Sequence, residues 1–256
     1  MPADVPSRPG RATLLAFELA TEACSVALWQ DGRLLARHEV APRRHAELAL
    51  PWAEALLAEA GVAKSQLDAL AVGVGPGAFT GVRLAISLVQ GIALGLDRPV
   101  VPVSTLAALA QPFLAEGPVL AAIDARMGEL YVGEFAADAE GLPKALAEEA
   151  LLPVASAAAA LLARGPATDL GRVGVGTGFA AGGGVWCAAL ADRLARVEAE
   201  ALPTASAVAR IAAPAWARGM AVAPERLEPT YLRDKVALTS AEQAAARAAK
   251  AGAGGA

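Results

Sequence analysis

The chain has 256 residues, of which 55% are hydrophobic, and its formal net charge is −4. This length is enough for one large domain or two modest ones, and the apolar fraction excludes a disordered chain. The charge excludes a broad basic field of the kind by which proteins grip nucleic acid unaided, so any such contact is expected to pass through a partner.

The first sixty residues predict a tail, three strands and a helix. Residues 1–12 carry three prolines and no apolar core, which predicts a mobile tail rather than a signal peptide. Three apolar segments then predict strands, at 14–19, 25–30 and 33–40. Asp31-Gly32, between the last two, is a strong hairpin signal. A helix is predicted over 45–60, ending at Gly61 and kinked or broken near Pro51.

A glycine-rich loop at 75–81 follows the next predicted strand, 70–74, and opens a second helix that ends near 96. The loop lacks the Gly-Lys-Ser/Thr of a P-loop, and it comes too late in the chain for a Rossmann fingerprint. Glycine permits positive φ and close approach by another group, and a helix start favours an anion. Three interpretations stay open: a phosphate cradle, a surface that meets a partner, and a tight turn without a ligand.

The second half repeats this pattern. A strand is predicted at 100–103, and Ser104 is predicted to cap a helix through 113. Strands at 119–124 and 129–136 pair across 126–128, so twice a strand that ends in an acid, Glu18 or Asp124, turns into an antiparallel strand. The later predictions are a helix at 155–162, a strand at 172–176, a second glycine-rich stretch at 176–184, a helix at 202–218 and a fraying tail at 241–256. The whole is α/β, with helices on the faces of a mixed sheet.

The helices at 45–60 and 81–96 carry more apolar surface than one sheet would cover. In the first, apolar residues make two seams: Leu48, Trp52 and Leu56 on one, Leu50 and Leu57 on the other. In the second, large apolar residues spread around most of the helix, and glycines at 91 and 95 would let another helix approach. A helix on its own sheet needs one stripe of about 100°. Burial within the domain is the ordinary explanation, but two neighbouring helices with this excess favour a protein–protein interface.

Residues for metal or redox chemistry are few. His38 and His45 do not form a His-x-x-x-His pair, and we expect surface or capping roles for them. Cys24 and Cys187 form no CxxC pair, which is typical of free thiols in a reducing cytoplasm, and no apolar stretch is long enough to span a bilayer. Three carboxylates, Glu18, Asp124 and Glu129, are either magnesium-binding candidates or ordinary strand-end and turn acids.

Five segments in order along the chain resemble the TsaB family: TEACSVAL (21–28), GPGAFTGVR (75–83), VSTL (103–106), IDARMGELY (123–131) and YLRDKVA (231–237). The resemblance implies an α/β ASKHA fold, similar to actin and sugar kinases, with two lobes built on mixed five-stranded sheets. It implies lobes at 13–103 and 104–238 between tails at 1–12 and 239–256. One departure is Glu18-Leu19-Ala20, where the family usually has Asp-Thr-Ser.

The resemblance also implies a role: a non-catalytic subunit that supports the catalytic subunit TsaD, beside the ATPase TsaE. That complex forms threonylcarbamoyladenosine next to the tRNA anticodon. The expected partner interface lies on the helices at 45–60 and 81–96, at Leu48, Trp52, Leu56, Arg83, Leu84, Leu88, Gly91 and Ile92. Candidate nucleotide or phosphate contacts are Thr21, Gly75, Gly77, Thr80 and Asp124. We expect the protein to lie in the cytoplasm and to bind no metal by itself. ATP and magnesium are implied for the whole complex, and contact with tRNA is expected only through that complex. A homodimer through the same helices is a further candidate.

Two other functions remain. An autonomous ATP-dependent enzyme related to sugar or acetate kinases would use the acids of both hairpins, Glu18 and Asp124, and calorimetry with ATP and magnesium would reveal it. A peptidase of the glycoprotease type ranks last, because the sequence offers no set of metal ligands, and chelator-sensitive proteolysis would revive it.

Overall fold

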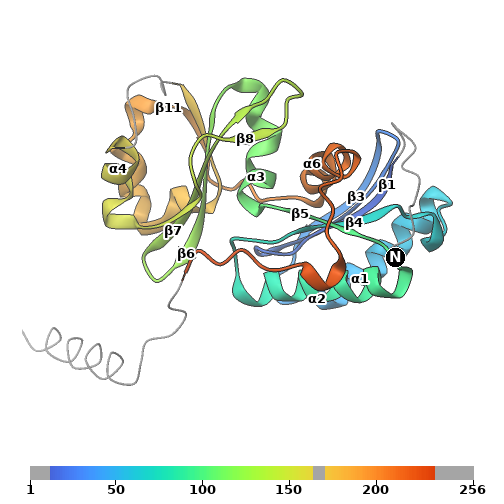
Figure 1. Cartoon of the computed structure of the whole chain (residues 1–256). Helices are drawn as coiled ribbons and strands as arrows, with labels where there is room; N and C mark the ends of the chain where they lie inside the picture. The colour runs from blue at the N-terminus through green and yellow to red at the C-terminus, as the bar shows by residue number, and fades with distance from the viewer. Residues whose placement is uncertain (1–11, 164–170, 234–256) are drawn as a thin grey trace, which may run out of the picture.

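The computed structural model describes residues 12–163 and 171–233, and these form two lobes joined side by side (Figure 1). The first lobe is built on a five-stranded mixed sheet in the order β3-β2-β1-β4-β5. Its strands are β1 (Thr13–Glu18), β2 (Ala23–Gln30), β3 (Arg33–Val40), β4 (Ala69–Gly73) and β5 (Val100–Val103). The first three are antiparallel neighbours, whereas β4 and β5 run parallel to β1.

The second lobe repeats this sheet with an addition. Its strands are β6 (Val119–Arg126), β7 (Glu129–Ala137), β8 (Pro143–Ala145), β9 (Ala150–Pro153), β10 (Arg172–Val175) and β11 (Leu194–Glu198). The order is β11-β10-β6-β7-β8, and β9 also pairs with β7. As in the first lobe, an antiparallel hairpin is followed by parallel strands on its other side. The predicted repetition is confirmed, but this sheet has six strands rather than the expected five because β7 pairs with two short strands.

Local signals place the ends of the elements in the first lobe. Asp31 and Gly32 both have positive φ, 50° and 90°, as a tight hairpin between twisted strands requires. Helix α1 (His45–Ala60) ends at Gly61, which is left-handed at φ 65°. The helix is not broken at Pro51, although a kinked or broken helix was expected there, and the kink itself stays a prediction. Helix α2 (Phe79–Leu96) begins two residues earlier than the sequence indicated.

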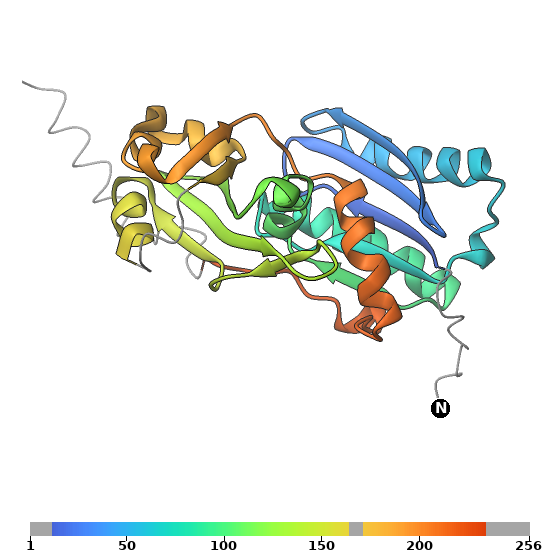
Figure 2. The ribbon, with the colours of Figure 1, turned by 90° about the horizontal axis from the view of Figure 1, so that it is seen from above.

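The two faces of the first sheet pack against different helices. Leu15 and Phe17 of β1 lie in one core with α1 and α2, whereas Leu14 and Ala16 lie in another with α6 (Ala205–Ala217). Side chains alternate along a strand, so a single strand supplies both cores. Figure 1 shows α1 and α2 on one side of the sheet and α6 on the other, and Figure 2 shows α6 crossing it.

Helix α6 lies on the first lobe, although the sequence placed all of 104–238 in the second. Its buried residues, among them Val208 and Ala212, pack on the first sheet, and Val222 pairs with Val100 of β5. The predicted division therefore differs from the structure after about residue 204: the chain returns to the lobe where it began. The expected tail at 239–256 lies outside the described residues.

The second sheet is covered by shorter helices. Helix α3 (Thr105–Ala110) packs on one face, and α4 (Val154–Ala163) and α5 (Val185–Ala188) pack on the other. The Ser104 hydroxyl accepts a hydrogen bond from the Ala107 amide (3.2 Å), as expected for the cap of α3. The α-helix stops at Ala110 and continues as a 3₁₀ turn, Gln111–Glu116, rather than reaching 113 as one helix. Ile211 of α6 packs against the cores of both lobes.

Candidate functional site

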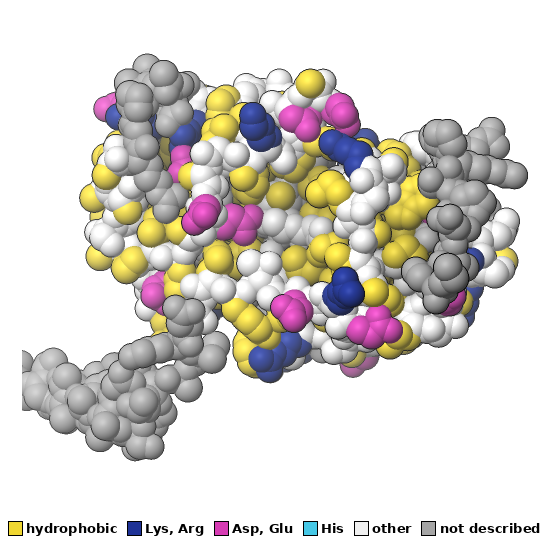
Figure 3. All heavy atoms as spheres, in the orientation of Figure 1, with side chains coloured by type: hydrophobic (Ala, Val, Ile, Leu, Met, Phe, Trp, Pro, Cys, Tyr) yellow, Lys and Arg dark blue, Asp and Glu magenta, His cyan; other side chains and the backbone are white. Residues whose placement is uncertain are grey.

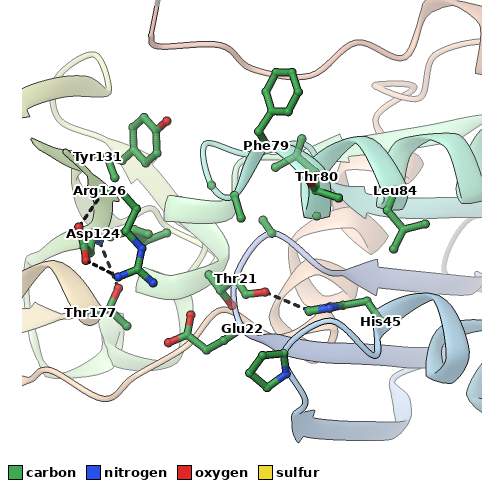
Figure 4. Close-up of a pocket in the computed structure, with 18 of the residues that line it drawn as sticks. Thr21, Glu22, His45, Phe79, Thr80, Leu84, Asp124, Arg126, Tyr131 and Thr177 are labelled. Carbon is green, nitrogen blue, oxygen red and sulfur yellow. Dashed lines mark hydrogen bonds and ion pairs between the residues drawn. The ribbon is translucent and has the colours of Figure 1, made fainter. Parts of the chain in front are cut away.

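A cleft of about 950 Å³ lies between the lobes and collects the segments that the sequence singled out. Its walls are the β1–β2 turn, the start of α1, the glycine loop with the first turn of α2, the end of β6, and residues 230–233. Figure 4 shows Thr21, Glu22, His45 and Thr80 on one side, with Asp124, Arg126, Tyr131 and Thr177 on the other. The cleft is therefore made jointly by both repeats.

At least two glycines of the glycine loop are required by close packing, because a side chain there would clash with neighbouring backbone. A Cβ on Gly77 would lie 2.5 Å from the Ala20 carbonyl oxygen, and one on Gly81 would lie 2.2 Å from that of Leu19. The Ala78 amide donates to the Ala20 carbonyl at 2.7 Å. The loop thus rests directly on the backbone of the β1–β2 turn, where a side chain would not fit. These glycines are explained without any phosphate.

Four of the five candidate phosphate contacts line the cleft: Thr21, Gly77, Thr80 and Asp124. Gly75 does not. Its amide donates to the Thr105 hydroxyl (3.1 Å), and its carbonyl accepts from the Thr105 amide (2.8 Å), so it ties the loop to the start of α3 behind the cleft.

Asp124 faces the cleft, but its own turn engages both carboxylate oxygens. Oδ1 accepts from the Arg126 amide (2.8 Å), and Oδ2 pairs with the Arg126 guanidinium (3.0 Å). The backbone of Arg126 is left-handed, at φ 63°, which folds the side chain back over the acid. The Arg126 guanidinium therefore partly neutralises the Asp124 carboxylate at the edge of the cleft.

Glu18, the matching acid of the first hairpin, lies behind the cleft. It is fully buried and fills the space that a side chain at position 73 would need, since a Cβ on Gly73 would lie 1.9 Å from Oε2. Oε1 accepts from the Ala20 amide (2.8 Å), and Oε2 accepts from the Thr105 hydroxyl (3.2 Å). Burial raises the pKa of Glu18 to about 7, and these hydrogen bonds only partly oppose that rise. The third acid, Glu129, is paired with Arg233 (2.6 Å).

Two parts of the cleft were missed in the sequence. His45 was expected at the surface or as a cap, but it is buried, with Nε2 3.0 Å from the Thr21 carbonyl oxygen and 3.2 Å from that of Ala23. A proton on Nε2 would fix the β1–β2 turn (Figure 4). Residues 230–233 also line the cleft. Neither role was inferred from the sequence, although residues 231–233 belong to a segment that carries the family resemblance, because both roles depend on contacts between distant segments.

The expected partner interface lies on the outer side of α1 and α2. Leu48, Trp52, Leu84, Leu88 and Ile92 are half-buried at its base, and Gly91 is exposed. Leu56 is fully buried in the core and takes no part in the surface. Arg83 is exposed, and its Nε donates to the Tyr231 hydroxyl (2.8 Å).

A shallow groove of about 250 Å³ runs between the two helices, with Leu50, Leu57, Gly91, Ile92, Gly95 and Leu96 among its lining. Leu50 is 47% exposed and Leu94, further along α2, is 55% exposed. The expectation that no apolar stretch is long enough to span a bilayer was wrong by length and composition: α2 could cross a membrane, although no other helix within 12–163 and 171–233 could. Its inner side, including Val82, Ile86 and Val89, is buried against the sheet, so α2 is a helix of the folded lobe with an apolar outer side.

The described part of the chain shows neither a strongly charged patch on the face in view (Figure 3) nor a cluster of metal ligands. On the face seen in Figure 3, acidic and basic side chains are interspersed, and no field of one sign dominates. In the residues that the structure describes, no group of three His, Cys, Asp or Glu side chains is placed to hold a metal ion.

Comparisons with known proteins point in one direction. The family model described as "TsaD: tRNA N6-adenosine threonylcarbamoyltransferase" matches residues 38–241. The chain is 40% identical over 229 residues to the tRNA threonylcarbamoyladenosine biosynthesis protein TsaB of Escherichia coli K12, a match that covers 88% of this chain and 96% of the relative.

Two solved structures from Pseudomonas aeruginosa are also similar. One is described as an uncharacterized protein with similarity to peptidase YEAZ; it has a TM-score of 0.78 and 44% identity, covering 87% of this chain and 100% of that one. The other is YeaZ, with a TM-score of 0.74 and 42% identity, covering 86% and 100%.

Proposed function

The chain belongs to the TsaB family, and from that premise we propose that it is a non-catalytic partner subunit of TsaD with the two-lobed ASKHA fold. In this role it supports a TsaD-like catalytic subunit as that subunit forms threonylcarbamoyladenosine next to the tRNA anticodon. The observation that carries the proposal is the apolar outer side of α1 and α2, which the rest of the described chain leaves uncovered.

The chemistry of this side suits another helix. Its groove is apolar, and the two glycines at its edge, Gly91 and Gly95, have open space where a Cβ would point. Glycine on a helix surface lets a second helix approach closely, and the leucines beside it supply the apolar area that association buries. Contiguous apolar surface of this kind marks protein interfaces. A TsaD-like partner of the same fold would bring a comparable pair of helices.

The remaining partners follow from the same role. We propose that a TsaE-like ATPase joins the complex, that tRNA is met through the complex, and that a second copy of this chain takes the α1–α2 side when TsaD is absent. The acidic net charge and the interspersed charges in Figure 3 support indirect contact with tRNA. The cytoplasm is the proposed setting.

Gly91→Arg tests the pairing. A side chain at 91 meets nothing within 4 Å in the isolated chain, so the variant should fold; indeed, replacing glycine inside a helix adds up to about 1 kcal/mol of stability. In a complex, the arginine would hold the partner helix away and bury a charge. We expect co-elution with the TsaD-like subunit to be lost while the thermal midpoint of the isolated chain is kept or raised.

The control for this test is Val185→Glu, which charges an apolar residue 72% exposed on the second lobe and should leave pairing intact. A parent chain that never co-elutes with TsaD would overturn the proposal, as would Gly91→Arg pairing as tightly as the parent. Calorimetry with ATP and magnesium on the isolated chain tests the kinase-like alternative, which the engaged Asp124 and the buried Glu18 disfavour.

A further inference from the structure

The chain after α6 is anchored along the first lobe. Val222 and Val100 exchange backbone hydrogen bonds of 2.9 and 2.8 Å at the free edge of β5. The Gln90 side chain of α2 donates to the carbonyls of Pro224 (2.9 Å) and Leu227 (3.3 Å). Leu227 is buried in the core beneath α2. Up to this point the segment is part of the first lobe.

After Glu228 and Pro229, the four residues Thr230–Arg233 cross to the second lobe, and we call them the strap. At its start, the Thr230 amide donates to the Val74 carbonyl beside the glycine loop (2.8 Å). At its end, Arg233 Nη2 donates to the Ala125 carbonyl (3.0 Å) and to Glu129 Oε2 (2.6 Å). These two acceptors flank the β6–β7 turn, so one guanidinium clamps both ends of it.

The middle of the strap is held by α2. The Arg83 guanidinium lies 3.7 Å from the centre of the Phe79 ring and 5.6 Å from that of Tyr231, and its Nε donates to the Tyr231 hydroxyl (2.8 Å). A cation against aromatic faces, with a hydrogen bond to one of them, fixes the orientation of both partners. The strap therefore joins the first turn of α2 to the hairpin of the opposite lobe.

We propose that the strap is an interlobe latch, with Tyr231 and Arg233 as positioning residues that set the width of the cleft. Lobes joined by connecting segments move relative to one another unless a substantial interface restrains them. The strap supplies charge-assisted bonds between the lobes at the cleft, and all four of its residues line that cleft. The contacts described above support the latch without reference to TsaD. Only the expectation that a latch variant still pairs with TsaD rests on the proposed function.

The test measures the distance between the lobes. Spin labels on cysteines at Ala58 of α1 and Ala159 of α4, both exposed, report it in a Cys187→Ala background that retains the buried Cys24. For the parent we expect one narrow distance distribution. Arg233→Ala should broaden or shift it, and Tyr231→Phe, which removes only the hydroxyl that Arg83 reaches, should have a smaller effect in the same direction. The Thr230 amide should also exchange about tenfold faster or more in Arg233→Ala.

Arg196→Ala is the matched control, because Arg196, like Arg233, is an arginine paired with carboxylate, but its partners Glu116 and Glu198 lie within the second lobe. It should reproduce the parent distribution. An Arg233→Ala distribution identical to that of the parent would overturn the latch.

A pull-down with the TsaD-like subunit separates this inference from the proposed function. The α1–α2 side belongs to the first lobe, so Arg233→Ala should still pair. Failure of the parent to pair would remove the proposed function and leave the latch measurement unaffected.

Discussion

At the scale of single residues, the most informative side chain is Glu18. It sits at the end of the first strand, where magnesium binding was one of the two interpretations left open by the sequence. Instead it is fully buried among β1, β4 and the start of α3, and its carboxyl group takes part in the core. Its pKa of about 7, raised by burial from 4.5, makes the stability of this chain depend on pH.

Glu18→Gln should remove that dependence. Between pH 4.5 and 7 the folded protein keeps a proton on Glu18 that the unfolded chain has released. The free energy of unfolding therefore falls as pH rises through this window, by about 3 kcal/mol for this group. Glutamine is neutral throughout, so the variant should lack that part of the decline and gain on the parent from pH 5 to 8 in denaturant titrations.

Glu148→Gln, which removes an exposed carboxylate, is the control and should follow the parent profile. Parallel profiles for Glu18→Gln and the parent would mean that Glu18 is ionised at no cost in the folded state.

At the scale of elements, α2 has two ends that use glycine differently. Gly81, in the first turn, lies against the Leu19 carbonyl, while Gly95, in the last turn, has open space around its missing Cβ. The first is required by tertiary packing on the β1–β2 turn. Gly95 lowers the helix propensity of α2 and makes no close contact within the chain. Its absent side chain would matter only if a partner packed on that side of α2.

Alanine substitution should separate the two. Gly81→Ala places a methyl group 2.2 Å from a backbone oxygen, which forces the loop and turn apart and should cost about 1–3 kcal/mol of stability. Gly95→Ala should be neutral or stabilising by up to about 1 kcal/mol. Thermal and denaturant unfolding of the two variants checks this, and equal losses would contradict the assignment.

At the scale of the whole molecule, the two lobes are not consecutive pieces of chain. One face of the first sheet is covered by α6, which begins more than a hundred residues after β5, and the segment after α6 pairs with the edge of β5. Small residues on the face of the sheet that α6 covers, such as Ala16, Ala27, Ala69 and Ala71, are buried in one core with α6. The chain therefore returns from the second lobe to the first at α6, and the strap then carries it back to the second lobe.

A fragment of residues 13–103 should therefore fail to fold by itself. Its sheet would be covered by α1 and α2 on one face and bare on the other, which leaves Leu14 and Val101 in water. We expect poor dispersion in its amide NMR spectrum and no cooperative thermal transition. Fusing residues 204–230 to the fragment should restore both, whereas a fragment that unfolds cooperatively without them would contradict this assembly.

The sequence by itself determined the elements and their repetition. The Asp31-Gly32 turn, the left-handed Gly61, the Ser104 cap and the apolar periodicity each act within a few residues, so they can be read locally. The resemblance gave the family, and the excess of apolar surface on α1 and α2 predicted an outward face. The short strands β8 (PKA), β9 (ALLP) and β11 (LARVE) were missed, because they lack the repeated valines that mark the equally short β5 (VVPV) and β10 (RVGV).

Only the tertiary structure decided which lobe α6 joins, that Glu18 is buried, that Arg126 engages Asp124, and that Arg233 clamps the opposite hairpin. Each of these depends on side chains far apart in the chain meeting across a core or a cleft. Burial, pKa and pairing are properties of that shared environment, and no local run of residues encodes it.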